Sequence, residues 1–192
     1  MKNALPFVLL ILACFGLSPR ANAGTEAGAF GNGNAASFKA KLLAAITRAD
    51  RIVVTEHSLA SDLRDPKTYR PLSEDEIIYG SRELDDKERL SFAAIVSDLI
   101  EEPKDNPSLC IFAPHHTVRF FSRGENYAVM NICFGCGQIT WGEGPVFNPR
   151  WLIPGLSVLV KQIGFEPKRD WRSLAEMHSP WLSAPGAVGP GG

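Results

Sequence analysis

The apolar residues of this chain recur with a helical period in three stretches. The first spans residues 37–49, and its apolar face is formed by Phe38, Leu42, Leu43 and Ile46. The second begins near Asp85, and its stripe consists of Phe92, Ile95, Val96 and Leu99. The third lies within residues 147–165 and carries Leu152, Leu156, Leu159 and Ile163. Residues three and four apart share one side of a helix, so each stretch predicts an amphipathic helix.

Polar residues mark the ends of two of these helices. Asp85 and Glu88 have the spacing of a capping box, in which each side chain bonds the backbone N–H of the other residue. Pro149 and Pro154 fit the early turns of the third helix, and Gly164 is a natural stop. These boundaries are predicted independently of the apolar period.

Short apolar or β-branched runs predict strands between the helices. They cover residues 51–57, 108–114, 117–122, 127–134 and 138–142. The polar stretch at residues 123–126 between two of the runs is typical of a hairpin turn, which favours an antiparallel meander. The order of the elements predicts an α+β fold, with a small antiparallel sheet of about four to five strands and helices packed on one face.

The connection over residues 58–83 has no sustained period. It contains prolines and many charged residues. A structureless segment of this length is uncommon in a compact domain, so we expect short elements in it or a binding surface.

The N-terminus has the three parts of a secretory signal peptide over residues 1–23. Lys2 precedes an apolar run from about residue 4 to residue 17, and Ala21-Asn22-Ala23 is a small-residue cleavage site. Export to the periplasm or the medium is therefore predicted. An alternative is acylation at Cys14, which alone would place the chain on a membrane.

The chain that remains after cleavage has two termini that offer little to bury. Residues 24–35 and 183–192 are rich in Gly, Ala and Pro and are predicted to be disordered tails. A single domain is expected over residues 36–182.

The charge of the mature chain excludes one class of partner. Removal of Lys2 and Arg20 leaves 18 basic and 21 acidic residues, a net charge of −3 with neutral histidines. The basic residues are scattered and not clustered, so nucleic acid is not expected as a partner.

Two cysteines lie two residues apart in the stretch Asn-Ile-Cys-Phe-Gly-Cys-Gly. Cys133 is expected to end a strand and Gly137 to open the next one. A thioredoxin-type site needs a helix N-terminus after the cysteines to stabilise the thiolate, and a strand is predicted here. A turn between strands is instead typical of a zinc knuckle.

One knuckle supplies half of a structural zinc site, and the rest would have to come from the preceding segment. A fold-back at Pro114 would bring Cys110 to Cys133 and Cys136, with His116 or alternatively His115 as the fourth ligand. A regular strand at residues 109–113 would keep Cys110 away. The alternatives are a disulfide among the three cysteines, as expected for an exported chain, or free thiols.

The segment from Cys110 to Cys136 resembles small exported bacterial proteins of unknown function. In those proteins an isolated Cys and a following Pro precede a strand that leads to Cys-Phe-x-Cys. Here the matching residues include Pro114 and Arg119. The resemblance implies an antiparallel sheet and a thiol cluster, and it implies no activity.

Two functional classes follow from these patterns. The first is a non-enzymatic binding or interaction module of the cell envelope, with an envelope protein or a glycan as partner. Its contact surface would be the 58–83 connection or the tryptophans of the last third. The second is a thiol-dependent redox protein or enzyme that uses Cys133 and Cys136. A hydrolase based on His57, Ser58 and Asp62 is not favoured, because neighbours in sequence rarely form a triad.

Overall fold

A computed structural model describes residues 35–65, 67–73, 75–100, 110–143, 146 and 148–179. The expected signal peptide and most of both expected tails lie outside these residues. The elements in chain order are α1 (Ala35–Arg48), β1 (Arg51–His57), β2 (Ile78–Glu83), α2 (Asp86–Asp98), β3 (His116–Ser122), β4 (Glu125–Cys133), β5 (Gln138–Trp141), α3 (Ile153–Gln162) and α4 (Trp171–His178). None of the helices in this part of the chain is long and apolar enough to cross a membrane.

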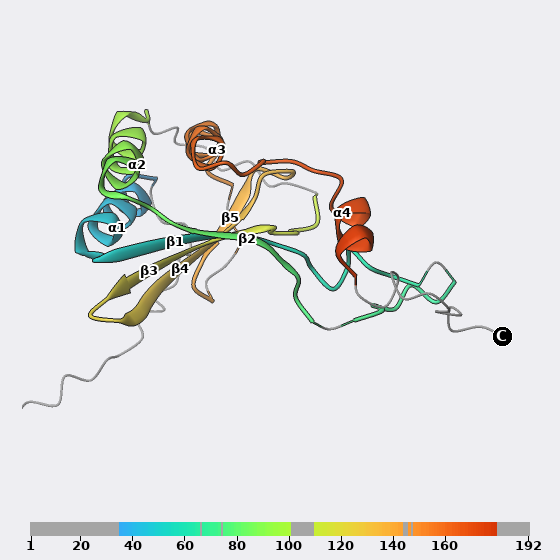
Figure 1. The fold of residues 1–192 in the computed structure, drawn as a ribbon. Coiled ribbons are helices and arrows are strands. Elements are labelled where there is room, and N and C mark those ends of the chain that lie inside the picture. The colour runs from blue at the N-terminus through green and yellow to red at the C-terminus, as the bar shows by residue number, and fades with distance from the viewer. Residues whose placement is uncertain are drawn as a thin grey trace, which may run out of the picture.

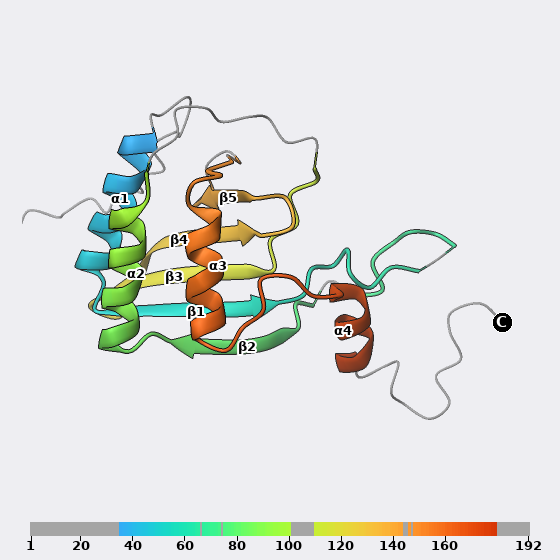
Figure 2. The ribbon, with the colours of Figure 1, turned by 90° about the horizontal axis from the view of Figure 1, so that it is seen from above.

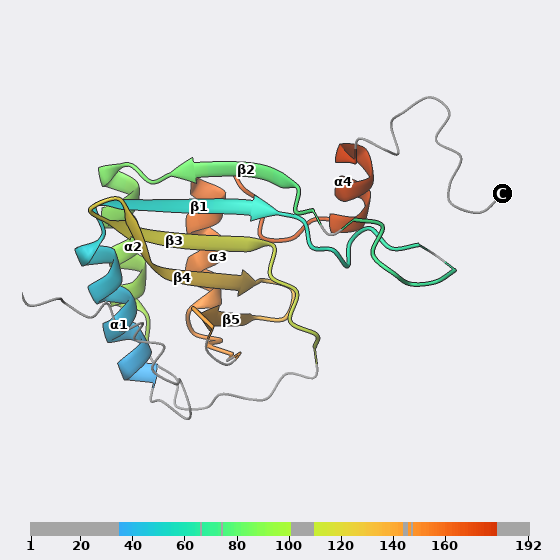
Figure 3. The same cartoon turned by 90° about the horizontal axis from the view of Figure 1, so that it is seen from below.

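The five strands form one antiparallel sheet in the order β2-β1-β3-β4-β5. Figure 3 shows this order from the side opposite α2 and α3. A tight turn joins β3 to β4, and its central residues Arg123 and Gly124 have φ values of 55° and 81°. Two positive φ values match the right-handed twist of the paired strands, which favours this kind of hairpin.

Three of the helices cover one face of the sheet, as Figures 1 and 2 show for α1, α2 and α3. The strand residues that point to these helices alternate with residues on the open face, as the pleat of a strand requires. The buried core residues of the strands are Ile52, Val54, Val118, Phe120, Met130, Ile132 and Ile139. The predicted α+β fold is confirmed.

The local predictions agree with the structure where the apolar period is strong. The capping box is present, because Asp85 accepts from the Glu88 N–H at 2.8 Å and Glu88 accepts from the Asp85 N–H at 2.9 Å. β1 has the predicted bounds. The strand predicted over residues 108–114 is wrong, since residues 110–115 contain no strand. β2 and α4 were not predicted as elements.

The packing of α2 against α3 depends on the absence of a side chain at Gly155. A Cβ atom at this position would lie 2.5 Å from Cγ2 of Ile95 and 3.3 Å from Cδ1 of Leu99. We expect Gly155→Val to lower the free energy of unfolding by about 1–3 kcal/mol through overpacking. Urea denaturation measures the change. Gly135→Ala is the control, because a Cβ there would meet nothing within 4 Å, and equal losses in both variants would contradict the packing described.

Candidate functional site

The sheet end where β1 stops and β3 starts carries most of the polar side chains with long-range contacts. Residues from the 58–77 connection and from the segment around α4 meet the sheet there, and Figures 1 and 2 show α4 beside that connection. The three cysteines that the sequence indicated lie at the same end of the sheet, nearer its other edge, where Cys133 ends β4, Cys136 lies in the turn before β5, and Cys110 lies in the segment before β3.

The cysteines form one disulfide and leave one thiol. Cys110 is bonded to Cys136, with 5.7 Å between their Cα atoms, and Cys133 is a buried free cysteine. The segment after Cys110 therefore folds back, as predicted for the case in which Cys110 reaches the other cysteines. The predicted turn between the strands is present at residues 134–137. Of the three chemistries considered for these residues, the geometry favours the disulfide.

The zinc set predicted from the sequence is not assembled in this structure. Cys110 and Cys136 share a covalent bond and cannot act as thiolate ligands in that state. The two candidate histidine ligands contact carboxylates instead: His116 faces Glu56, and His115 faces Asp62. Within the described ranges, no group of three or more His, Cys, Asp or Glu side chains could hold a metal ion.

His115 connects the start of β3 to the 58–77 connection. Its Nε2 atom lies 3.1 Å from each carboxylate oxygen of Asp62, and both side chains are about nine-tenths buried. The imidazole stacks on the indole of Trp171 in α4, with ring centroids 4.2 Å apart and planes 3° from parallel. Asp62 also accepts from the Leu59 N–H at 2.7 Å. One histidine thus joins the sheet, the connection and α4.

His57 makes a second link between the sheet and the same connection. Its Nδ1 atom lies 2.7 Å from Oε1 of Glu76 and 3.0 Å from the Ser58 carbonyl oxygen, so this nitrogen must donate. Its Nε2 atom lies 2.9 Å from Oγ1 of Thr117. Glu76 belongs to the last part of the connection, so both ends of that segment are paired with histidines.

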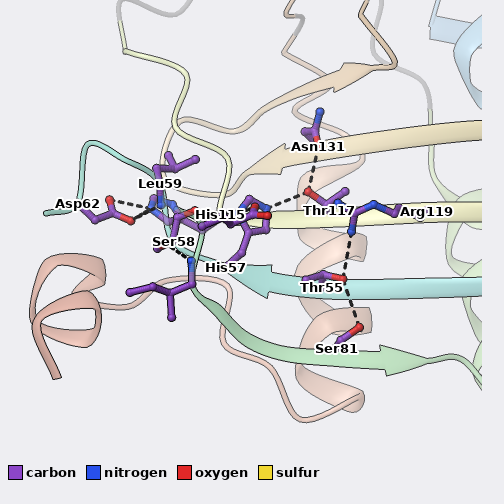
Figure 4. A network of polar contacts seen from close by, with 12 residues as sticks. Thr55, His57, Ser58, Leu59, Asp62, Ser81, His115, Thr117, Arg119 and Asn131 are labelled. Carbon is purple, nitrogen blue, oxygen red and sulfur yellow. Dashed lines mark hydrogen bonds and ion pairs between the residues drawn. The ribbon is translucent and has the colours of Figure 1, made fainter. Parts of the chain in front are cut away.

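Thr117 continues the link across the open face of the sheet. Its hydroxyl donates to Oδ1 of Asn131 at 3.0 Å, and the Asn131 amide donates to Thr140 at 3.1 Å. Arg119 donates to the Thr55 hydroxyl at 3.3 Å on the same face. Figure 4 shows Asn131, Thr117, Arg119 and Thr55 on neighbouring strands. The network is a set of cross-strand pairs that fixes the strand register at this end.

Glu56 and His116 occupy the opposite, core side of the sheet end. Oε1 of Glu56 accepts from Nε of Arg169 at 2.9 Å and from the Glu166 N–H at 3.3 Å. Nε2 of His116 lies 3.5 Å from the same oxygen, has no hydrogen-bond partner, and makes only an electrostatic contact. The Glu56 and Arg169 pair holds the segment before α4 on the sheet.

The neighbours of Ser58 do not form a catalytic triad. Asp62 pairs with His115 and not with His57, and Oγ of Ser58 accepts from the Ile77 N–H at 2.8 Å. Tyr79 of β2 has a pKa raised to about 12, mainly by burial and next by the charge of Asp62. Its phenol is therefore neutral at physiological pH. The triad considered for His57, Ser58 and Asp62 is therefore not assembled.

The described residues beyond Asp62 form a hydrogen-bonded loop. We call residues 64–65 and 67–71 the tip loop. Arg64 and Pro71 form an antiparallel bridge at its base, and the Leu72 N–H donates to the Leu63 carbonyl at 2.9 Å. Leu63 is buried, with an exposed fraction of 6%. The expectation that this connection hides short elements is therefore correct for its outer part and for β2.

Asp65 organises the inside of the tip loop. Its Oδ1 atom accepts from the backbone N–H groups of Lys67 at 2.8 Å and Thr68 at 2.7 Å. Its own N–H donates to the Arg70 carbonyl at 3.0 Å, and its carbonyl accepts from the Tyr69 N–H at 2.8 Å. Tyr69 has a φ of 57° and is 71% exposed. A bulky residue rarely adopts this backbone region, and such strain is typical of functional positions.

The tryptophans divide between the core and this site. Trp141 and Trp151 pack edge-on against Phe38 of α1, with ring centroids 5.9 Å and 6.5 Å apart. Trp171 is stacked on His115 at the sheet end. Trp181 lies outside the described residues. Trp171 was one of the tryptophans of the last third that the sequence offered as a contact surface, and it packs at the sheet end on His115.

Comparisons with protein-family models, with curated protein sequences and with solved structures found no match for this chain.

Proposed function

We propose that this chain is a non-enzymatic binding module of the cell envelope, and that the tip loop is its contact surface. In this proposal the Cys110–Cys136 disulfide is a structural link. Export rests on the N-terminal pattern of residues 1–23, and a disulfide is typical of exported chains. The partner is an envelope protein or glycan.

The observation that carries the proposal is the exposure of Tyr69 on an ordered loop. Its side chain is 71% exposed, although tyrosine supplies a large amphipathic surface that proteins commonly use for contacts. The backbone around it is held by hydrogen bonds to Asp65. A loop that is ordered before binding loses less conformational entropy when a partner binds, which favours recognition.

The sheet end supplies the rigidity that such a contact surface needs. The pairs of His115 with Asp62 and of His57 with Glu76 hold the two ends of the connection. Figure 4 shows both histidines at the end of their strands. Binding residues on loops positioned by a rigid scaffold are a common arrangement, and this geometry fits it.

The thiol-dependent alternative has less support. The turn that contains Cys136 leads into β5, so no helix N-terminus follows to lower the pKa of a thiolate there. The remaining thiol, Cys133, has an exposed fraction of 4% and would not be accessible for exchange. We therefore do not propose a redox activity.

Photo-cross-linking tests the proposed contact surface. A photoreactive phenylalanine analogue replaces Tyr69 in the full chain, and the same analogue replaces Val158, which is 49% exposed on α3. After irradiation of the producing cells, we expect an adduct from position 69 and none from position 158. The same weak smear from both positions would contradict the proposal, because random collisions depend on exposure alone.

A further inference from the structure

The tip loop presents cations around its exposed aromatic side chain. Arg64, Lys67 and Arg70 are all exposed, and backbone hydrogen bonds within the tip loop bring them into one tight loop with Tyr69. Arg64 also donates to the Tyr69 carbonyl at 3.5 Å. The cations and the aromatic ring therefore belong to one exposed loop.

The loop also contains one acidic residue, Asp65, so its three basic residues leave a formal net charge of +2. Oδ1 of Asp65 is turned toward the backbone, where it accepts from the N–H groups of Lys67 and Thr68. These hydrogen bonds lower the pKa of the Asp65 carboxyl from its ordinary value, so the group stays ionised and offsets one of the three positive charges. Farther back, Glu76 is paired with His57, and Asp75 is exposed.

A local excess of positive charge stands out on this chain, because the full sequence has a formal net charge of −1. Clustered cations raise the local concentration of anionic ligands and increase the rate at which they associate. The guanidinium groups of Arg64 and Arg70 have the planar geometry that binds carboxylates and phosphates through two hydrogen bonds.

We propose that the tip loop binds an acidic polysaccharide, a chain of sugars that carries carboxylate or phosphate groups. Lys67 and Arg70 pair with the anionic groups, and the exposed ring of Tyr69 packs against the apolar face of a sugar. This inference rests on the proposed function, since it names the partner of the same contact surface. Because the loop projects from the sheet end in Figure 2, it suits an extended polymer rather than a small enclosed ligand.

An anionic membrane is the main competing partner for a basic loop. Membrane binding scales with the apolar area that enters the lipid, in addition to the charge. Among the residues placed in the tip loop and next to it, the exposed large hydrophobic side chains are Tyr69 at 71% and Leu72 at 37%. This small apolar surface favours a polymer in solution over insertion into a bilayer, and the experiment below includes vesicles to separate the two.

The experiment measures binding of the full mature chain to polygalacturonate, phosphomannan and neutral mannan at low salt. The test variant is Lys67→Ala/Arg70→Ala, and Tyr69→Ala is a second variant. The matched control is Lys87→Ala/Lys161→Ala, which changes the net charge equally at exposed positions of α2 and α3. Vesicles of phosphatidylglycerol and of phosphatidylcholine form a parallel arm. Circular dichroism verifies that every variant folds.

We expect binding to at least one acidic polysaccharide and none to neutral mannan. Both tip-loop variants should bind on the order of tenfold more weakly, while the control binds as wild type does. Added salt should weaken binding, as it screens exposed charges. Absence of binding to either acidic polysaccharide, equal losses in the control variant, or binding to phosphatidylglycerol vesicles alone would overturn the inference.

The cross-linking experiment separates failure of this inference from failure of the proposed function. A discrete protein adduct at position 69 without polysaccharide binding overturns the inference and leaves the tip loop as a contact surface. No adduct at position 69 and no polysaccharide binding overturn both.

Discussion

Replacement of both Cys110 and Cys136 by alanine is expected to lower the free energy of unfolding by about 3.5 kcal/mol. The two residues are 26 positions apart, and the chain-entropy model for a cross-link that closes a loop of this length gives about that value. The bond joins the segment before β3 to the turn between β4 and β5, so its loss frees a long stretch of the unfolded chain. Urea denaturation of the oxidised wild type and of the variant measures the difference.

Reductant supplies the control for this prediction. A thiol reductant should bring the wild type to the stability of the double variant and should leave the variant unchanged. Cys133→Ala should keep its sensitivity to reductant, since Cys133 is not in the bond. If Cys133→Ala abolishes that sensitivity, the bond joins Cys133 to a neighbour, and the arrangement described for the turn is incorrect.

Glu56→Gln is expected to lower the free energy of unfolding by about 2–3 kcal/mol at neutral pH. The substitution keeps the volume of the side chain and removes the charge that accepts from Arg169 and from the Glu166 N–H. Hydrogen bonds to charged groups contribute about 1.5–3 kcal/mol each, and the Glu56 side chain is 4% exposed. Glu176→Gln is the matched control, because its pair with Arg172 is exposed and should change stability by less than about 1 kcal/mol. Equal effects would contradict a structural role for Glu56.

The same site predicts how stability depends on pH. Burial alone would raise the pKa of Glu56, but the contacts of His116 and Arg169 lower it below 4.5, so its contribution is present above that pH and is lost as the pH falls through the folded value. Burial lowers the pKa of His116 from its ordinary value of 6.5, and the nearby His115 and His57 lower it further. The contact with Glu56 raises this pKa, but by less than burial lowers it. The unfolded chain therefore binds a proton near pH 6.5 that the folded chain does not, and stability also falls below that pH. In Glu56→Gln the loss below pH 4.5 should be smaller than in the wild type.

The elements that could be predicted from sequence are those whose stability is mostly local. The capping box at Asp85 and the apolar stripe of α2 are contained in a few turns of chain, and β1 is a β-branched run. β2 was missed because it is an edge strand with mostly exposed residues, and its pairing of Ser81 with Thr55 is long-range. α4 has only eight residues, of which Ala175 is the buried one, so its amphipathic pattern covers too few turns to be recognised from sequence.

The apolar run before β3 was wrongly predicted as a strand because a long-range contact overrides its local preference. Residues 110–113 have the composition of a strand, but the disulfide draws Cys110 to the turn at Cys136. The segment therefore has a covalent partner and no strand partner among the described residues. Composition reports the preference of a segment for a strand, and it contains no information about which distant residue holds the segment.

The cysteines and histidines were visible as candidates in the sequence, whereas their partners were not. His115 and Asp62 are 53 residues apart, and the sequence named Asp62 only as a triad candidate with its neighbours His57 and Ser58. A usable indication did exist: His57 ends β1 and His116 begins β3, so antiparallel pairing of these strands had to bring the histidines together. The register that determines which carboxylate each one meets comes from the tertiary fold.

The account depends on the tip loop as the surface that meets a partner, and photo-cross-linking at position 69 tests this most directly. The account predicts an adduct at position 69, broad in mass because the proposed partner is a polysaccharide, that weakens in the Lys67→Ala/Arg70→Ala background and persists in Lys87→Ala/Lys161→Ala. Position 158 on α3 should give no such adduct. An adduct at position 158 with none at position 69 would contradict the account, because it would place the contact surface on the helical face.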